Sequence, residues 1–187
     1  SLVEAQFHSV MDDIGIDAIK IGMLGRPELA DAVADLLLTL PPGFPVVFDP
    51  VMVATSGAAL NEGGTAAAMA RLLPLATLVT PNLPELEALG GVDAILAAAP
   101  AVLVKGGHGE GDTLVDRLVT RDGEVARWED ARIDTRHTHG TGCTLAAAIA
   151  TGLGQGMALD AAIARARQFV RAAIKAAYPT HGIHGEE

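Results

Sequence analysis

One short segment of the sequence combines residue types that could bind a phosphate and move a proton. Gly140, Thr141 and Gly142 are followed by Cys143 and by an alanine-rich stretch without proline. Two glycines permit a tight turn, and the amides of a helix that begins there would converge on one point, which favours an anion such as a phosphate. A thiol at such a helix start is well placed to act as a base or a nucleophile. An ordinary glycine-containing helix start with a buried cysteine fits the segment equally well, so both interpretations stay open at this point.

The residues after Cys143 predict the helix that this turn would begin. Leu145, Ile149 and Leu153 recur at every fourth position, which gives a helix one apolar stripe facing a core. His139 precedes the turn, so a Cys–His hydrolase is an alternative reading of the same segment. The sequence offers no third residue placed to orient the histidine of such a hydrolase, and we expect His139 to have a structural role.

Apolar segments of strand length alternate with helical patterns along the chain. Strands are expected at residues 18–23, 46–48, 77–80 and 101–105, and a hairpin at 114–120 and 124–128. Helices are expected at residues 4–14, 27–40, 64–73, 93–99 and 159–178, with a short one ending near residue 90 and another departing from residue 143. Strands that alternate with helices form a mostly parallel sheet between helices. The sequence therefore predicts a single-domain α/β fold, a three-layer α/β/α sandwich with a mostly parallel central sheet.

Polar residues follow the ends of these expected strands. In an open α/β sheet, ligands bind outside the carboxyl ends of the strands. The residues at these positions are Asp49, Asn82, Glu85, Lys105, Gly106 and Gly107. Each has a plain structural explanation: Asp49 precedes a proline and could be a turn residue, and Glu85 could be an acid in the first turn of a helix. Their recurrence at one edge of the sheet favours a shared function.

A kinase would use all of these groups. Phosphoryl transfer depends mainly on positioning and on neutralising the charge of the transferred group. Asp49 and Glu85 could hold Mg²⁺ directly or through waters, since oxygen ligands suit that ion. Lys105 could contact nucleotide phosphates, and the amides of residues 140–143 could stabilise the transferred phosphoryl group. Cys143 would then deprotonate the attacking hydroxyl group.

Composition excludes several classes of partner. The 187-residue chain has a formal net charge of −10, which disfavours a nucleic-acid or anionic-membrane surface, because both need a basic footprint. No apolar run reaches membrane-spanning length. A single cysteine excludes an internal disulfide and suggests a reducing compartment, so a cytoplasmic location is expected.

Five motifs, in order, resemble those of the hydroxymethylpyrimidine/phosphomethylpyrimidine kinases of thiamine synthesis, which belong to the ribokinase-like superfamily. The resemblance extends from about residue 6 to about residue 178. The motifs are Lys20-Ile-Gly-Met-Leu24, Asp49-Pro-Val-Met52, Thr80-Pro-Asn-Leu-Pro-Glu85, Val104-Lys-Gly-Gly-His108 and Thr138-His-Gly-Thr-Gly-Cys-Thr144.

The resemblance implies a role for each site residue. It makes Gly140, Thr141 and Gly142 an anion hole and Cys143 the catalytic base. It places ATP against Lys105, with Asn82, Gly106 and Gly107 beside it, and assigns the Mg²⁺ and its waters to Asp49 and Glu85. Met23 and Val51 would line the pyrimidine pocket together with Cys143.

The resemblance also leaves alternatives open. Family members begin with a strand, a helix and a set of covering strands, so we expect this sequence to lack the N-terminal strand and the lid portion of the domain. Some relatives with the cysteine-containing turn accept pyridoxal, which makes a pyridoxal or pyridoxine kinase the nearest alternative. A non-catalytic nucleotide-binding remnant is the second one. Relatives with such lids pair, which implies a homodimer.

Overall fold

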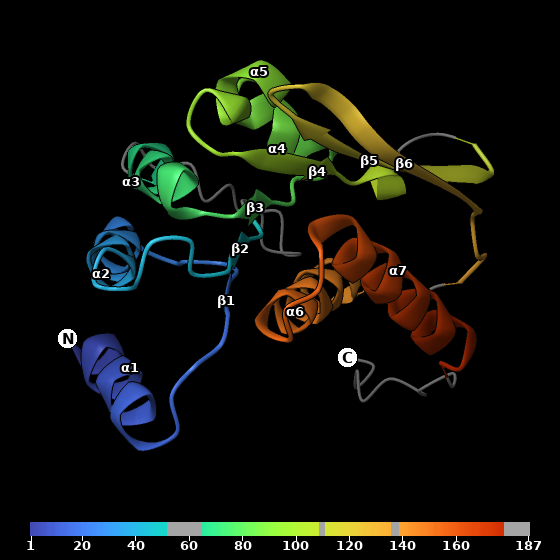
Figure 1. The fold of residues 1–187 in the computed structure, drawn as a ribbon. Helices are drawn as coiled ribbons and strands as arrows, with labels where there is room; N and C mark the ends of the chain where they lie inside the picture. The colour runs from blue at the N-terminus through green and yellow to red at the C-terminus, as the bar shows by residue number, and fades with distance from the viewer. Residues whose placement is uncertain (52–64, 109–110, 136–138, 178–187) are drawn as a thin grey trace, which may run out of the picture.

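Six strands lie side by side in the order in which they occur along the chain (Figure 1). The computed structural model describes residues 1–51, 65–108, 111–135 and 139–177. Within these ranges the strands are β1 (Ile19–Ile21), β2 (Val46–Phe48), β3 (Leu78–Val79), β4 (Ala101–Val104), β5 (Thr113–Thr120) and β6 (Gly123–Ala131). The first four are parallel, whereas β5 and β6 form an antiparallel hairpin that pairs with β4. The predicted strands and hairpin are therefore confirmed.

Helices connect and cover these strands. They are α1 (Leu2–Asp13), α2 (Pro27–Leu37), α3 (Thr65–Leu72), α4 (Leu83–Ala88), α5 (Gly91–Leu96), α6 (Thr141–Gly154) and α7 (Leu159–Lys175), with short 3₁₀ turns η1 (Leu73–Leu75) and η2 (Gly106–His108). Met52 and Thr138 of the quoted motifs lie outside the described residues, as do the expected ends at residues 64 and 178 of two helices.

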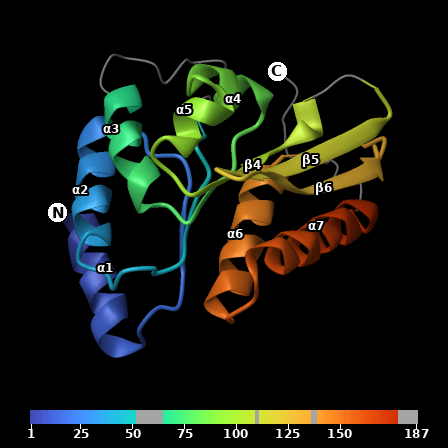
Figure 2. The ribbon, with the colours of Figure 1, turned by 45° about the horizontal axis from the view of Figure 1, so that its top comes forward.

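The sheet is buried on both faces because alternate strand residues contribute to two separate cores. Val46 and Phe48 pack with α2, α3 and α5 on one face, whereas Val47, between them, packs with α6 and α7 on the other. Figures 1 and 2 show the two helical layers on either side of the sheet. The predicted three-layer sandwich is thus confirmed, and it leaves the carboxyl ends of β1 to β4 at one edge.

Helix α6 begins earlier than the sequence suggests. The sequence predicts that it departs from Cys143, but Thr141 is its first residue and Gly140 is the residue before it, with a left-handed φ of +77°. A residue with a Cβ is strained in that conformation, so glycine suits this position. The turn and the helix start are therefore one feature, with Cys143 in the first helical turn.

The apolar stripe predicted for α6 faces the core as expected. Leu145 and Ile149 are buried, and Leu153 is half-buried. Gly152 lets α7 come close, because a methyl group there would lie 2.9 Å from the Cβ atom of Ala162. The buried stripe fixes the rotation of α6, and with it the direction of the helix start.

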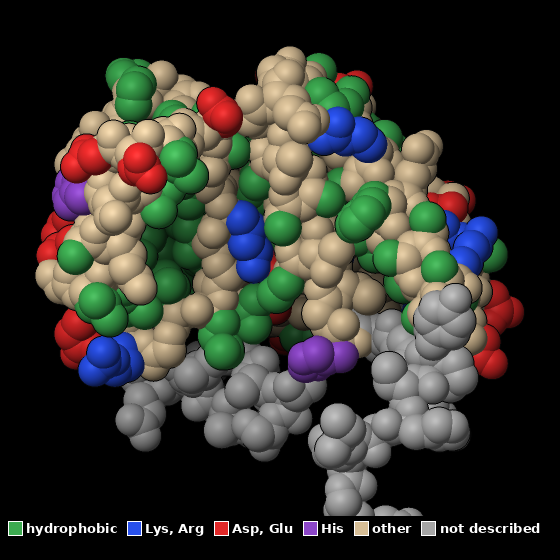
Figure 3. Space-filling view, turned by 90° about the horizontal axis from the view of Figure 1, so that it is seen from below, with side chains coloured by type: hydrophobic (Ala, Val, Ile, Leu, Met, Phe, Trp, Pro, Cys, Tyr) green, Lys and Arg blue, Asp and Glu red, His purple; other side chains and the backbone are tan. Residues whose placement is uncertain are grey.

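The surface is acidic overall, in line with the net charge of −10. Figure 3 shows one face on which a Lys or Arg side chain lies near the middle, among hydrophobic groups, while Asp and Glu side chains lie mostly toward the rim. None of the helices in the described ranges is long and apolar enough to cross a membrane.

Candidate active site

The parallel register brings the polar ends of neighbouring strands together. Asp49 directly follows β2, and its amide donates to the carbonyl of Ile21 in β1 at 2.9 Å. Asn82 and Lys105, which follow β3 and β4, form a parallel bridge. The amide of Lys105 donates to the Pro81 carbonyl at 2.9 Å. Side chains that are far apart in sequence therefore share one edge of the sheet.

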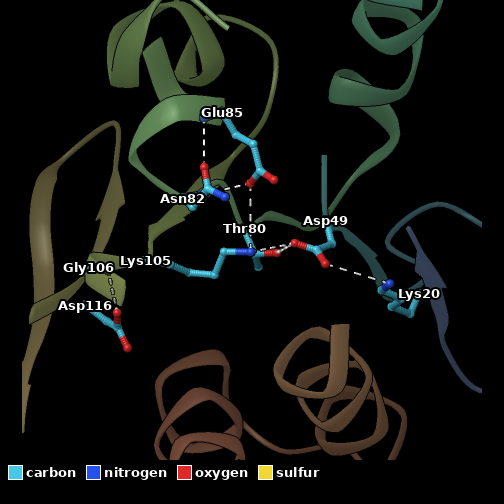
Figure 4. A network of polar contacts seen from close by, with 8 residues as sticks. All are labelled: Lys20, Asp49, Thr80, Asn82, Glu85, Lys105, Gly106 and Asp116. Atoms are coloured by element: carbon cyan, nitrogen blue, oxygen red, sulfur yellow. Dashed lines mark hydrogen bonds and ion pairs between the residues drawn. The ribbon is translucent and has the colours of Figure 1, made fainter. Parts of the chain in front are cut away.

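Asp49 is the centre of a charged cluster at this edge (Figure 4). Its side chain is 1% exposed, and its Oδ1 atom accepts from Lys105 Nζ at 2.7 Å and from Thr80 Oγ1 at 3.1 Å. The Oδ2 atom lies 3.8 Å from Lys20 Nζ and is buried without a hydrogen-bond partner among the described residues. One carboxylate is thus shared by two ammonium groups, and no hydrogen bond within the described residues reaches its Oδ2 atom.

Asn82 and Glu85 cap the start of α4 reciprocally. The Glu85 amide donates to Asn82 Oδ1 and the Asn82 amide donates to Glu85 Oε2, each at 2.8 Å. This capping box confirms the structural explanation for Glu85, an acid in the first helical turn. The same carboxylate lies 3.9 Å from Lys105 Nζ, and burial raises the pKa of Glu85. Its metal role stays a prediction.

The glycine turn lies next to this cluster. A methyl group at Gly142 would lie 3.4 Å from Lys105 Nζ. The first backbone hydrogen bond of α6 runs from the Thr144 amide to the Gly140 carbonyl at 2.9 Å, so the amides of Gly142 and Cys143 precede the helical ladder. The Cys143 thiol is exposed rather than buried. The anion-binding interpretation of the turn therefore gains a neighbouring cation, and a buried cysteine is wrong.

The glycines after Lys105 have different surroundings. The Gly106 amide donates to Asp116 Oδ1 at 2.8 Å, and a methyl group there would lie 2.1 Å from the Val115 carbonyl oxygen. Glycine is required at this position because β5 passes too close for any side chain. Gly107 is exposed, and its carbonyl accepts from Arg132 Nη1 at 3.2 Å.

The residues expected to line a pyrimidine pocket lie at the same edge. Met23 follows β1 and is 55% exposed, and Val51 follows β2 and is half-buried. A hollow of about 350 Å³, lined by residues such as Leu96 and Thr120, is elsewhere, because Thr120 pairs with Ala101 at the opposite end of β4 from Lys105. We assign no substrate to it.

Three charged residues near the cluster had no predicted role. Lys20 belongs to a quoted motif, and its head group lies so close to Gly22 that a methyl group there would be 2.4 Å from Nζ. Asp116 and Arg167 form a largely buried ion pair of 2.7 Å between β5 and α7. The sequence contains one sign of this ion pair: Arg167 is a charged residue within the apolar stripe of α7, next to Ala166.

Comparison with known proteins decides the family. The family model described as phosphomethylpyrimidine kinase matches residues 1–186. The chain belongs to the phosphomethylpyrimidine kinase family. The resemblance carried by the five motifs is thereby confirmed.

Individual relatives agree with this assignment to the phosphomethylpyrimidine kinase family. The hydroxymethylpyrimidine/phosphomethylpyrimidine kinase of Streptomyces coelicolor is 45% identical over 195 residues, an alignment that covers 96% of this chain and 71% of that protein. The thiamine biosynthesis bifunctional protein ThiED of Geobacter sulfurreducens is 42% identical, covering 99% of this chain and 40% of that protein. An ADP complex of Bacillus subtilis pyridoxal kinase superposes with a TM-score of 0.84 at 35% identity, covering 95% of this chain and 72% of that one.

Proposed function

We propose that this protein transfers the γ-phosphoryl group of ATP to the hydroxymethyl oxygen of 4-amino-5-hydroxymethyl-2-methylpyrimidine. It then phosphorylates the monophosphate, giving the diphosphate used to build thiamine. The observation that carries the proposal is the proximity of Lys105 Nζ to the helix start, 3.4 Å from a methyl group placed at Gly142. A cation and converging amides at one point suit a phosphoryl group in transfer. The name of the Streptomyces relative supports the pyrimidine substrate, and that of the Geobacter relative supports thiamine biosynthesis.

The residues of the turn divide the chemical work. Cys143, as its thiolate, accepts the proton of the attacking hydroxyl group and becomes a thiol, and its exposed side chain is open to a substrate. The amides of Gly142 and Cys143 and the ammonium group of Lys105 offset the negative charge on the phosphoryl oxygens. Met23 and Val51 orient the pyrimidine ring, while Asn82, Gly106 and Gly107 border the nucleotide.

The carboxylates fit a magnesium ion held chiefly by phosphates and water. Mg²⁺ commonly binds proteins through one or two carboxylates, with the remaining ligands from substrate phosphates and waters. Asp49 Oδ2 is buried without a hydrogen-bond partner in the part of the chain that the structure describes, and Glu85 Oε2 lies 3.9 Å from Lys105 Nζ, which also contacts Asp49. The described residues include no group of three or more His, Cys, Asp or Glu side chains able to hold a metal by themselves. When bound, the ion neutralises charge on the phosphate oxygens.

Parallel assays of two alcohols test the proposal. We expect ATP-dependent phosphorylation of the hydroxymethylpyrimidine, followed by a second transfer to the monophosphate, detected by chromatography and mass spectrometry of the products. Pyridoxal is the matched competitor, because the Bacillus subtilis structure is a pyridoxal kinase. Preferential turnover of pyridoxal would replace the proposed substrate, and nucleotide binding without turnover of either alcohol would favour the non-catalytic remnant. The homodimer stays a prediction that light scattering tests.

A further inference from the structure

The backbone that carries Lys105 is held from two sides. On one side, the Lys105 amide donates to the Pro81 carbonyl at the end of β3. On the other, the next amide, that of Gly106, donates to the carboxylate of Asp116 at 2.8 Å. Asp116 is the only side chain that a hydrogen bond links to Gly106 in the described residues, and it comes from the neighbouring strand β5 (Figure 4).

Asp116 is itself fixed by Arg167. Its second oxygen, Oδ2, accepts from Arg167 Nε at 2.7 Å, and the two side chains are only 14% and 9% exposed. The Arg167 guanidinium also contacts Asp130 in β6 at 2.9 Å and lies over the Trp128 ring, 5.7 Å from its centroid. A planar guanidinium held by two carboxylates and a ring has one orientation, so it fixes the carboxylate beside it.

A continuous series of contacts therefore runs from α7 to the cation of the site. It passes from Arg167 to Asp116, from Asp116 to the Gly106 amide, and through one peptide bond to Lys105, whose Nζ contacts Asp49 and lies next to Gly142. Gly106 lies directly against β5, because a methyl group there would lie 2.1 Å from the Val115 carbonyl oxygen.

We propose that Asp116 and Arg167 are positioning residues that hold Lys105 against the phosphate-binding turn. This inference rests on the proposed function, because it takes Lys105 to contact nucleotide phosphates. The two acidic partners of Arg167 divide the roles: Asp116 reaches Gly106, whereas Asp130 joins the hairpin to α7 through Arg167 and Arg171.

The experiment measures binding of the β,γ-methylene analogue of ATP with Mg²⁺ by calorimetry, so it needs no pyrimidine turnover. Asp116→Asn is the test variant, because Gly106 and Arg167 donate to different oxygen atoms of Asp116, and in asparagine one of these positions carries an NH₂ group that cannot accept. We expect its Kd to rise about ten-fold. Arg171→Met is the matched control: it removes an ion pair to Asp130 from the same helix without touching Asp116, and we expect it to leave Kd unchanged.

A double-mutant cycle separates positioning from general destabilisation. If Asp116 acts through Lys105, Asp116→Asn will not weaken binding further in a Lys105→Met background, whereas a purely structural effect would be additive. An unchanged Kd for Asp116→Asn, or full additivity with Lys105→Met, would overturn the proposal.

If Asp116→Asn does not fold, Arg167→Lys replaces it as the test variant. Lysine keeps the positive charge but cannot contact both carboxylates in the same way, and the same two outcomes apply. Nucleotide binding by a wild-type protein that leaves the pyrimidine unphosphorylated would refute the proposed substrate alone.

Discussion

Lys105 Nζ lies 2.7 Å from Asp49 Oδ1, although 56 residues separate the two in sequence. The contact joins the ends of β2 and β4 across the intervening strand β3, and it places an ammonium group beside the start of α6. Because Asp49 is 1% exposed, the ammonium group of Lys105 compensates a buried negative charge. The same ammonium group also places a positive charge beside the start of α6.

Replacing Lys105 with methionine should weaken nucleotide binding and destabilise the fold. Binding should fall by about ten-fold or more, since hydrogen bonds to charged groups contribute about 1.5–3 kcal/mol. The free energy of unfolding should fall by about 3 kcal/mol, because a buried carboxylate loses its shortest ion pair. Calorimetry and urea denaturation measure the two effects.

Two further variants distinguish these effects of Lys105. Asp49→Asn combined with Lys105→Met removes the unpaired charge, so stability should recover in part while nucleotide affinity stays low. Lys20→Met leaves the 2.7 Å contact intact and removes only an ammonium group 3.8 Å from Asp49, so both of its effects should be smaller. Equal affinity losses for the two lysine variants would contradict a special role for Lys105.

Cys143→Ala should lower the turnover rate by about 100-fold or more while leaving nucleotide affinity intact, because general base catalysis contributes that much to proton transfer. Single-turnover kinetics and calorimetry give the two quantities. Thr151→Ala is the control: it lies on the same helix, and its hydroxyl bonds only to the Ala147 carbonyl in the described structure. A turnover rate that survives in Cys143→Ala would remove the thiol from the mechanism.

Two glycines at opposite ends of α6 allow a controlled test of the turn, with Gly140 as the test position and Gly156 as the control. Gly140 has a φ of +77° and Gly156 a φ of +79°, and beyond its chain neighbours a methyl group at either would meet no atom of the described residues within 4 Å. Alanine at each should therefore cost a similar free energy of unfolding, about 1–2 kcal/mol of backbone strain. Only Gly140→Ala should weaken binding of the ATP analogue, because only this glycine belongs to the phosphate-binding turn. Similar affinities for the two variants would count against the turn as the anion site.

Glu85→Gln should change how stability depends on pH. Burial raises the pKa of Glu85, so the folded protein binds this proton more tightly than the unfolded chain does. The resulting contribution to the free energy of unfolding falls as pH rises from the ordinary carboxyl range through the raised pKa. Glutamine keeps an acceptor for the Asn82 amide but does not titrate, so the variant should gain stability relative to wild type over that interval.

Urea denaturation in metal-free buffer at several pH values measures this difference. Glu87→Gln, which removes one charge from an exposed position of the same helix, controls for net charge. A stability difference between Glu85→Gln and wild type that stays constant across the interval would show that Glu85 does not titrate in this way. Adding Mg²⁺ and the ATP analogue afterwards tests the metal role separately, as a loss of Mg²⁺-dependent affinity.

The sequence by itself determined the α/β architecture and the edge of the sheet at which the polar residues gather. Alternation, helical spacing and turn residues are local patterns, and a parallel sheet brings the carboxyl ends of its strands to one edge. For this reason Asp49, Asn82 and Lys105 could be placed together before their contacts were known. The five motifs likewise identified the family, and its model matches nearly the whole chain.

Only the tertiary structure decided which groups are partners. Lys105 pairs with Asp49 because β2 and β4 lie on either side of β3. Asn82 and Glu85 are partners because their side chains and amides meet across the first turn of α4. Arg167 is buried because β5 and β6 bring two carboxylates to α7. Burial and ion pairing depend on distances between elements that are remote in sequence. Periodicity tells which face of an element is covered, but not which charge lies opposite.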